Sequence, residues 1–146
     1  MVFELITSSN KLWEQVKEYA STCSWSAGKA LANNMEANVY TDWERVIVAY
    51  QGEQICGYCT VSKTDCIPNA PYTPYIGYIF VNEEYRGNRL SQKIIMFAIS
   101  YLKEIGFSDV YLISDHENLY EKYGLSVVDR AVAPWGSIEK IYHRFI

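Results

Sequence analysis

The sequence has no long apolar run and no excess of basic residues. None of its apolar segments approaches the roughly 20 residues that a helix needs to cross a bilayer, and the first residues, MVFELIT, lack the basic segment of a signal peptide. Lys and Arg number 13 against 17 Asp and Glu, a net charge of −4. Because nucleic-acid-binding domains normally carry a basic face, we expect a cytoplasmic protein with neither a membrane nor a nucleic-acid partner. A small cationic substrate suits this charge balance.

The chain also lacks the second cysteine pair that a zinc site would need. Cys56 and Cys59 have redox or zinc spacing, but they lie in an expected strand, where residues three apart point to opposite faces. A redox pair normally stands at a helix start. Neither His116 nor His143 is at metal-ligand spacing from this pair. We therefore expect reduced, buried thiols and no metal, and we disfavour a redox or zinc protein.

What the sequence does have is the material for one domain spanning residues 1–146, with 49% apolar residues. Apolar periodicity and breaks divide it into short elements. A loop with three prolines is expected over 62–74. Strands are expected at 2–7, 45–51, 54–62, 75–81, 109–114, 125–132 and 137–146, and helices at 9–22, 25–37, 90–105 and 115–123.

The middle of the chain predicts a right-handed βαβ unit. Residues 75–81 (YIGYIFV) and 109–114 (DVYLIS) are apolar on both faces, as parallel strands covered on both sides are, and a regular helical stripe separates them. The remaining strands are joined by short connections, which favour antiparallel pairing. The expected class is α+β: a mixed, mostly antiparallel sheet with one parallel pair and flanking helices.

A polar break follows the central strand at 82–89 and contains only one glycine. Helix N-termini bind phosphate through free backbone N–H groups and the helix dipole, and Arg86 and Arg89 would add charge-assisted hydrogen bonds. Equally, Glu83 and Glu84 could pair with these arginines in a solvated helix start. The segment by itself leaves both interpretations open.

Two motifs together resemble the GNAT N-acetyltransferase superfamily. Residues 81–90 (VNEEYRGNRL) are similar to its acetyl-CoA-binding motif, Arg/Gln-x-x-Gly-x-Gly/Ala after a central strand. Residues 119–125 (LYEKYGL) resemble its Phe-Tyr-Glu-Lys-x-Gly-Phe stretch, one strand later. The order of elements is similar along nearly the whole chain. The resemblance implies a GNAT-like fold and direct acetyl transfer from acetyl-CoA to a primary amine within a ternary complex.

The same resemblance assigns the cofactor site. The pantetheine arm of acetyl-CoA would pair with the end of the central strand, and its pyrophosphate would lie against the break that follows. Arg89 replaces a motif glycine and Ser91 a Gly/Ala, and we expect the backbone to keep a helical path at Arg89. The implied cofactor-binding residues are Phe80, Val81, Arg86, Gly87, Asn88, Arg89, Leu90 and Ser91.

The reaction needs a proton donor for the departing thiolate and a base for the attacking ammonium. Tyr120 matches the family's tyrosine donor, although it could simply pack its helix on the sheet. The central strand has no carboxylate. His116, which is expected to open the short helix, is one candidate base because of its pKa range. A water chain relayed by Tyr75 or Tyr78 is another.

Acceptor contacts are expected from residues 23–26, the proline loop and residues 133–136. Trp25 and Trp135 would form the walls of an amine site through cation–π contact, or they belong to the core. The acceptor is a small-molecule amine or a peptide amine, and exposed C-terminal edge strands could support a homodimer. The alternative to an enzyme is a CoA-binding module of the same fold with little catalysis, acting as a sensor or partner protein.

Overall fold

The structure, a computed structural model, describes residues 1–146 and contains one sheet of seven strands in the order β1-β2-β3-β4-β5-β7-β6. Every neighbouring pair is antiparallel except β4 and β5. This confirms the α+β class and the parallel pair. The elements are β1 (Val2–Ile6), α1 (Trp13–Thr22), α2 (Gly28–Glu36), β2 (Arg45–Gln51), β3 (Gln54–Ser62), β4 (Tyr75–Val81), η1 (Glu83–Tyr85), α3 (Leu90–Glu104), β5 (Asp109–Ser114), η2 (Tyr120–Tyr123), β6 (Ser126–Val132) and β7 (Ile138–Phe145).

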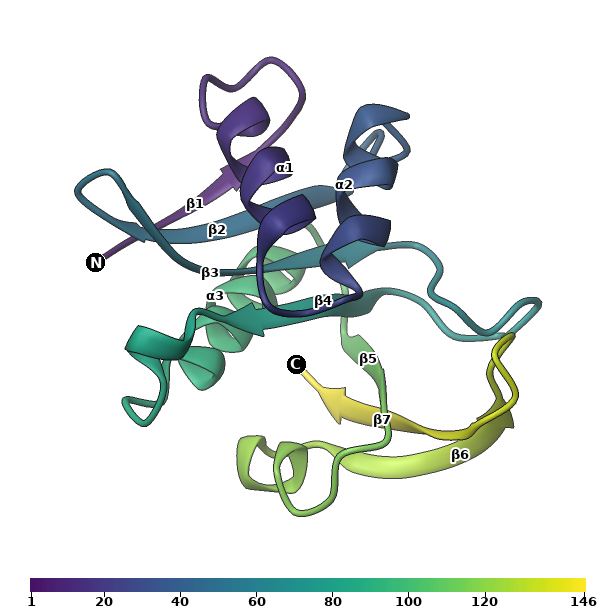
Figure 1. The fold of residues 1–146 in the computed structure, drawn as a ribbon. Coiled ribbons are helices and arrows are strands. Elements are labelled where there is room, and N and C mark those ends of the chain that lie inside the picture. The colour runs from purple at the N-terminus through teal and green to yellow at the C-terminus, as the bar shows by residue number, and fades with distance from the viewer.

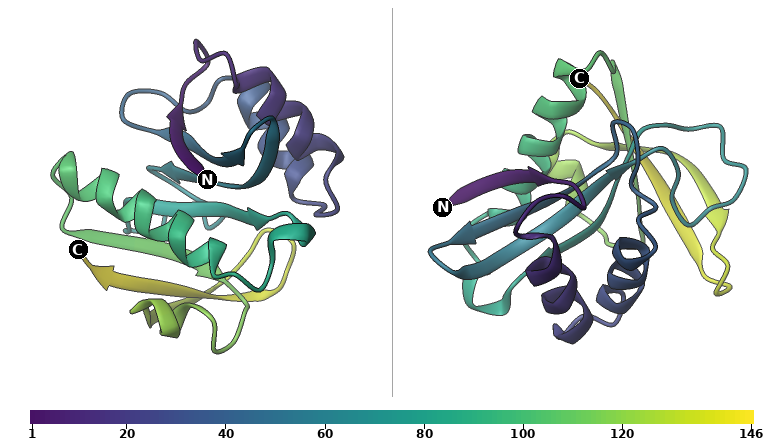
Figure 2. Two further views of the ribbon diagram at one scale, coloured as in Figure 1. Left: turned by 90° about the vertical axis from the view of Figure 1, so that its left-hand side faces the viewer. Right: turned by 90° about the horizontal axis from the view of Figure 1, so that it is seen from above.

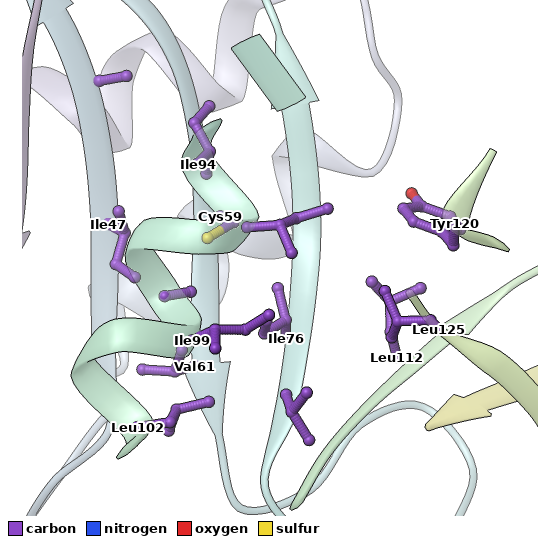
Figure 3. Packing of buried hydrophobic residues seen from close by; sticks show 14 of the residues in the cluster. Ile47, Cys59, Val61, Ile76, Ile94, Ile99, Leu102, Leu112, Tyr120 and Leu125 are labelled. Atoms are coloured by element: carbon purple, nitrogen blue, oxygen red, sulfur yellow. The ribbon is translucent and has the colours of Figure 1, made fainter. Parts of the chain in front are cut away.

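Helices cover both faces of the β1–β4 half of the sheet. Seen from above, the strands run between α1 and α2 on one side and α3 on the other (Figure 2). Strand alternation explains the division: Val46 and Val48 of β2 face α1 and α2, while Ile47 faces α3. Figure 3 shows the α3 side, where Ile94 packs over β2 and β3.

The sheet opens between β4 and β5. Their ladder has the single register pair Tyr75 and Tyr111, supported by the Tyr111 N–H, which donates to the Pro74 carbonyl at 2.9 Å. A bulge follows in β4, where Tyr78 adopts φ 48°. From there the two strands diverge, as Figure 1 shows. The backbone edge of β4 that faces β5 is therefore left without a strand partner beyond Tyr75.

The predicted strands agree with the structure to within a residue or so at their ends, but three predicted helices begin too early. Asn10 explains the first case: its side chain accepts from the Leu12 N–H at 2.8 Å, and this turn holds the chain until α1 begins at Trp13. The second helix begins at Gly28 rather than at residue 25. None of the helices has the length and apolar composition that a bilayer span requires.

The cysteine geometry also differs from the prediction. Cys56 and Cys59 are both fully buried in the cluster beneath α3, so they do not point to opposite faces. The reason is a bulge opposite Ala49 and Tyr50 of β2, which adds one residue to β3 and resets its alternation. All four cysteines are free thiols.

Candidate active site

A cavity of about 380 Å³ opens where β4 and β5 diverge. The three segments expected to contact an acceptor all contribute: residues 23–26 through Trp25, the proline loop through Asp65 and Cys66, and residues 133–136 through Trp135. Tyr120 and His116 also line it. The full lining is Trp25, Ala27, Ala30, Asp65, Cys66, Ile76, Gly77, Tyr78, Ile79, Leu112, Ile113, Ser114, Asp115, His116, Tyr120, Trp135 and Glu139.

Tyr120 combines a core position with access to this cavity. Its ring is 6% exposed and packs edge-on against Tyr142 at 5.6 Å. In Figure 3 its hydroxyl points away from Leu112 and Leu125. Burial raises the pKa of Tyr120 to about 12, although Ser114 partly offsets this through a hydrogen bond. The phenol therefore keeps its proton at neutral pH, as a proton donor must.

His116 lines the cavity, but it does not open a helix. The short helix is confined to Tyr120–Tyr123, because Ser114 Oγ accepts from the His116 N–H at 3.0 Å and turns the chain instead of capping a longer helix. The His116 carbonyl also accepts from the Tyr142 hydroxyl at 2.9 Å. Its imidazole is exposed, and its centroid is 6.2 Å from the Tyr120 ring. The backbone thus fixes this residue at the rim, near the predicted donor.

The two tryptophans form different walls. Trp25 stacks on Phe80 at 5.9 Å and meets Tyr78 edge-on at 6.4 Å, so it is held within an aromatic group. Trp135, in the β6–β7 turn, is 65% exposed, which excludes a core role for it. Both indole rings line the cavity from opposite segments of the chain.

Sequence reasoning did not single out Asp65 and Glu139, two of the three carboxylates of this cavity. Asp65 packs against β4: its Oδ2 lies 2.8 Å from where a side chain at Gly77 would begin. Burial raises the pKa of Asp65. Glu139 is 6% exposed and accepts a hydrogen bond from Ser137 Oγ at 3.0 Å. Its alternation with the buried Ile141 along β7 was the available signal.

A second cavity, of about 270 Å³, lies at the start of α3, further along the same edge of β4. Leu90 is buried and fixes the first turn of α3, while the chain before it is exposed. No side chain caps this helix end, so its first N–H groups point outward without a partner from the helix. The lining residues are Val81, Arg86, Gly87, Arg89, Leu90, Ser91 and Tyr123.

Arg86 is held in place above the end of β4. Its Nε–H donates to the Val81 carbonyl at 3.0 Å, and its guanidinium lies 5.6 Å from the centroid of the Phe80 ring. Neither arginine forms an ion pair with Glu83 or Glu84, since the four salt bridges of the protein lie elsewhere. The mutual pairing of charges in a solvated helix start is therefore not what the structure shows.

Arg89 departs from the expected helical path. It has φ 58° and ψ 29°, the left-handed conformation that favours glycine, and it immediately precedes α3. Gly87, two residues earlier, also has a positive φ of 85°. The helix begins at Leu90, as predicted, but the chain must reverse its direction to enter it, so Arg89 lies in the turn and not on a helical path. The Arg89 side chain is exposed and free of intramolecular partners.

Only some of the remaining predicted cofactor residues line the cavity at the start of α3. Ser91 is tied to η2, because its Oγ lies 2.9 Å from the Tyr123 hydroxyl. Phe80 is buried against Tyr58, and with Asn88 it does not line the cavity at the start of α3. Tyr123 was missed because its position varies in the motif.

Known structures share this architecture. An aminoglycoside 6'-N-acetyltransferase complexed with coenzyme A superposes with a TM-score of 0.75 at 16% identity, covering 99% of this chain and 97% of that one. The aminoglycoside 6'-N-acetyltransferase from Enterococcus faecium gives 0.73 at 16% identity, with the same 99% and 97% coverage. A GNAT family N-acetyltransferase from Escherichia coli in complex with CoA gives 0.74 at 18% identity, covering 99% and 80%.

The sequence itself carries the family pattern. No curated protein sequence matches the chain, but the profile of the acetyltransferase (GNAT) family matches residues 10–125, which include both motifs, the diverging strands and the cavity at the start of α3. The chain belongs to the GNAT acetyltransferase family and is an acetyltransferase enzyme.

Proposed function

We propose that the protein transfers an acetyl group directly from acetyl-CoA to a primary amine, within a ternary complex. The observation that carries this proposal is the unpaired edge of β4. Ile76–Ile79 border the cavity that contains Tyr120, and Val81 borders the cavity at the start of α3. A thioester seated along this edge would lie between a site for its phosphates and a site for an amine.

The residues at the start of α3 fit the pyrophosphate of acetyl-CoA. Free N–H groups and the positive end of the helix dipole favour an anion there, and Arg86 and Arg89 supply two positive charges. We assign cofactor binding to Arg86 through Ser91, with Val81 and Phe80 at the strand end. Acetyl-CoA supplies the acetyl group, and no metal is invoked.

We assign the proton transfers of the reaction to two side chains, His116 and Tyr120. We assign His116 as the base that accepts the ammonium proton, because its ring lies at the cavity rim close to Tyr120. The amine nitrogen then forms a bond to the acetyl carbon as the carbon–sulfur bond breaks, and Tyr120 donates its phenolic proton to the leaving thiolate. The second proton, which the nitrogen loses on becoming an amide, returns to the Tyr120 phenolate through solvent.

Two of the three superposed structures named above are aminoglycoside 6'-N-acetyltransferases, and aminoglycosides are small molecules with several amino groups. The absence of lysine and arginine from the acceptor cavity supports a small-molecule amine, in preference to a macromolecular partner. We propose the cytoplasm as the compartment, in keeping with four free thiols. Residues 1–146 act as one unit in this proposal.

Removing the Tyr120 hydroxyl tests catalysis separately from cofactor binding. For Tyr120→Phe we expect kcat to fall by about 100-fold or more, measured as CoA thiol release with an amine panel. The acetyl-CoA dissociation constant should stay unchanged, because the hydroxyl faces the other cavity. Tyr50→Phe is the control, since it loses one hydroxyl that bonds Glu4 on β1. Tight acetyl-CoA binding without CoA release by the wild type would favour the alternative of a CoA-binding module.

A further inference from the structure

The acceptor cavity is strongly unbalanced in charge. Its lining includes the carboxylates of Asp65, Asp115 and Glu139 but no lysine or arginine, and His116 is its one side chain that can become cationic. An acceptor with a single amino group would leave most of this negative charge uncompensated. Asp115 is exposed, but Glu139 is buried and Asp65 is partly buried, and carboxylates shielded from water without a cationic partner are costly.

The three carboxylates come from different segments of the chain. Asp65 belongs to the proline loop and packs against β4 at Gly77, and Glu139 belongs to β7. Asp115 directly follows β5, and its charge adds to the effect of burial on the pKa of the Tyr120 phenol. Asp115 is therefore the carboxylate assigned to the reaction centre, which leaves Asp65 and Glu139 for a second cation.

Asp65 and Glu139 both lack a cationic partner. Asp65 Oδ1 accepts from the Cys66 backbone N–H at 2.6 Å, Oδ2 rests over Gly77, and none of the four ion pairs includes this carboxylate. Glu139 has only the Ser137 hydroxyl as a donor and no ion pair.

A buried hydroxyl lies near Asp65, outside the cavity lining. Tyr75 Oη is the buried side-chain oxygen or nitrogen that lacks any hydrogen-bond partner. Tyr75 and Gly77 share one face of β4, opposite Ser62 and Thr60 of β3, and Asp65 covers this face. The charge of Asp65 contributes, after burial, to raising the pKa of Tyr75 to about 12. Because Tyr75 does not line the cavity, the acceptors open to an ammonium group, which has three donors, are the carboxylates of Asp65 and Glu139.

From this arrangement we infer that the acceptor is an amine with a second cationic group, which binds Asp65 and Glu139 while the reacting amine faces Tyr120. The inference rests on the proposed function and names its substrate class. Trp25 and Trp135 would cover the apolar chain between the two nitrogens. Asp65 and Glu139 are then specificity residues and make no contact with the reacting atoms.

Equilibrium binding tests the inference without turnover. α,ω-Diamines from diaminopropane to diaminooctane, each beside the alkylamine of equal length, are titrated into the CoA-bound protein by calorimetry. For the best chain length we expect the diamine to bind at least about tenfold more tightly than the alkylamine, the effect of one charge-assisted hydrogen bond or more. In Glu139→Gln, which can still accept from Ser137, this preference should fall by about tenfold, while alkylamine affinity stays the same.

Glu104→Gln is the matched control, because it removes one exposed carboxylate at the far end of α3 and should keep the full preference. Equal affinity for diamine and alkylamine at every length overturns the inference, as does an unchanged preference in Glu139→Gln. CoA release measured on the same pairs from acetyl-CoA distinguishes the two proposals. Diamine preference without release contradicts the proposed function alone, and release without preference contradicts only the diamine.

Discussion

Replacing Arg89 with glycine separates the backbone role of this position from its charge. A residue with a Cβ atom pays about 1–2 kcal/mol in the left-handed region, and glycine loses about 0.5–1 kcal/mol more backbone entropy on folding. The exposed side chain forms no ion pair or hydrogen bond that would be lost. We therefore expect Arg89→Gly to raise the free energy of unfolding by up to about 1 kcal/mol, or about 2–4 °C in Tm.

Cofactor affinity should change in the opposite direction. Loss of one charge-assisted hydrogen bond to phosphate corresponds to at least about 1.5 kcal/mol, or roughly a tenfold increase in the acetyl-CoA dissociation constant. Arg89→Ala should lose the same affinity without the gain in stability, since alanine keeps its Cβ in the left-handed conformation. Calorimetric titration with acetyl-CoA and thermal unfolding of the free protein measure the two quantities. Lys103→Ala removes a positive charge from the other end of α3 and serves as the control.

Two outcomes would refute this reasoning. Wild-type acetyl-CoA affinity in both Arg89 variants would show that the arginine is not a phosphate ligand. A loss of stability of more than about 1 kcal/mol in Arg89→Gly would show that the arginine side chain stabilises the turn, contrary to its exposed position.

Two further substitutions test the sheet around the cavities. Because burial raises the pKa of Asp65, its folded-state carboxyl holds a proton above the ordinary value of 3.8, so wild-type stability falls as pH rises through the interval between the two values. Asp65→Asn should therefore raise Tm at neutral pH but not below pH 3.8, and equal Tm shifts at both pH values would contradict this sign. At Gly57 a methyl group would come within 2.7 Å of the Phe80 carbonyl oxygen and 2.9 Å of Ile94 Cδ1. Gly57→Ala should lower the free energy of unfolding by about 1–3 kcal/mol, whereas a Tm equal to that of the wild type would mean that β4 shifts without cost.

The strands and their class followed from the sequence because apolar alternation is a local signal. The runs at 75–81 and 109–114 are apolar on both faces; the structure buries residues on both faces of the first run, whereas in the second only Val110 and Leu112, which share one face, are buried. Helix starts were less predictable. Ser114 could cap a helix or close a turn, and only the tertiary position of Tyr142, which bonds the His116 carbonyl, favours the turn.

Parts of the candidate site could also be predicted from the sequence. The motif residues around Arg86 and Tyr120, and the segments around Trp25 and Trp135, were predicted from the sequence, and the structure brings them to two neighbouring cavities on β4. The backbone at Arg89 was predicted wrongly, because its φ depends on the direction from which the chain enters the helix, which no residue type at 86–91 specifies.

The presence of Asp65 and Glu139 in the same cavity could be recognised only from the tertiary structure. Asp65 follows β3 in a loop, and Glu139 lies more than 70 residues later on β7. Their common position depends on β7 lying beside β5 and on the proline loop folding back over β4. Neither relation has a local sequence signal.

Because β4 and β5 share a single register pair, the sheet consists of two parts, and α3 packs against both. Strands β1–β4 form one part and β5, β7 and β6 the other, and the cluster beneath α3 includes Ile47 from the first part and Val110, Leu112 and Tyr142 from the second. Because α3 joins the two parts on one face of the sheet, the gap between β4 and β5 on the other face does not disrupt the hydrophobic core. A ligand that enters the gap would form hydrogen bonds with the unpaired backbone of β4 and would not need to displace packed side chains. The position that a further strand would occupy in a continuous sheet is therefore open to a ligand.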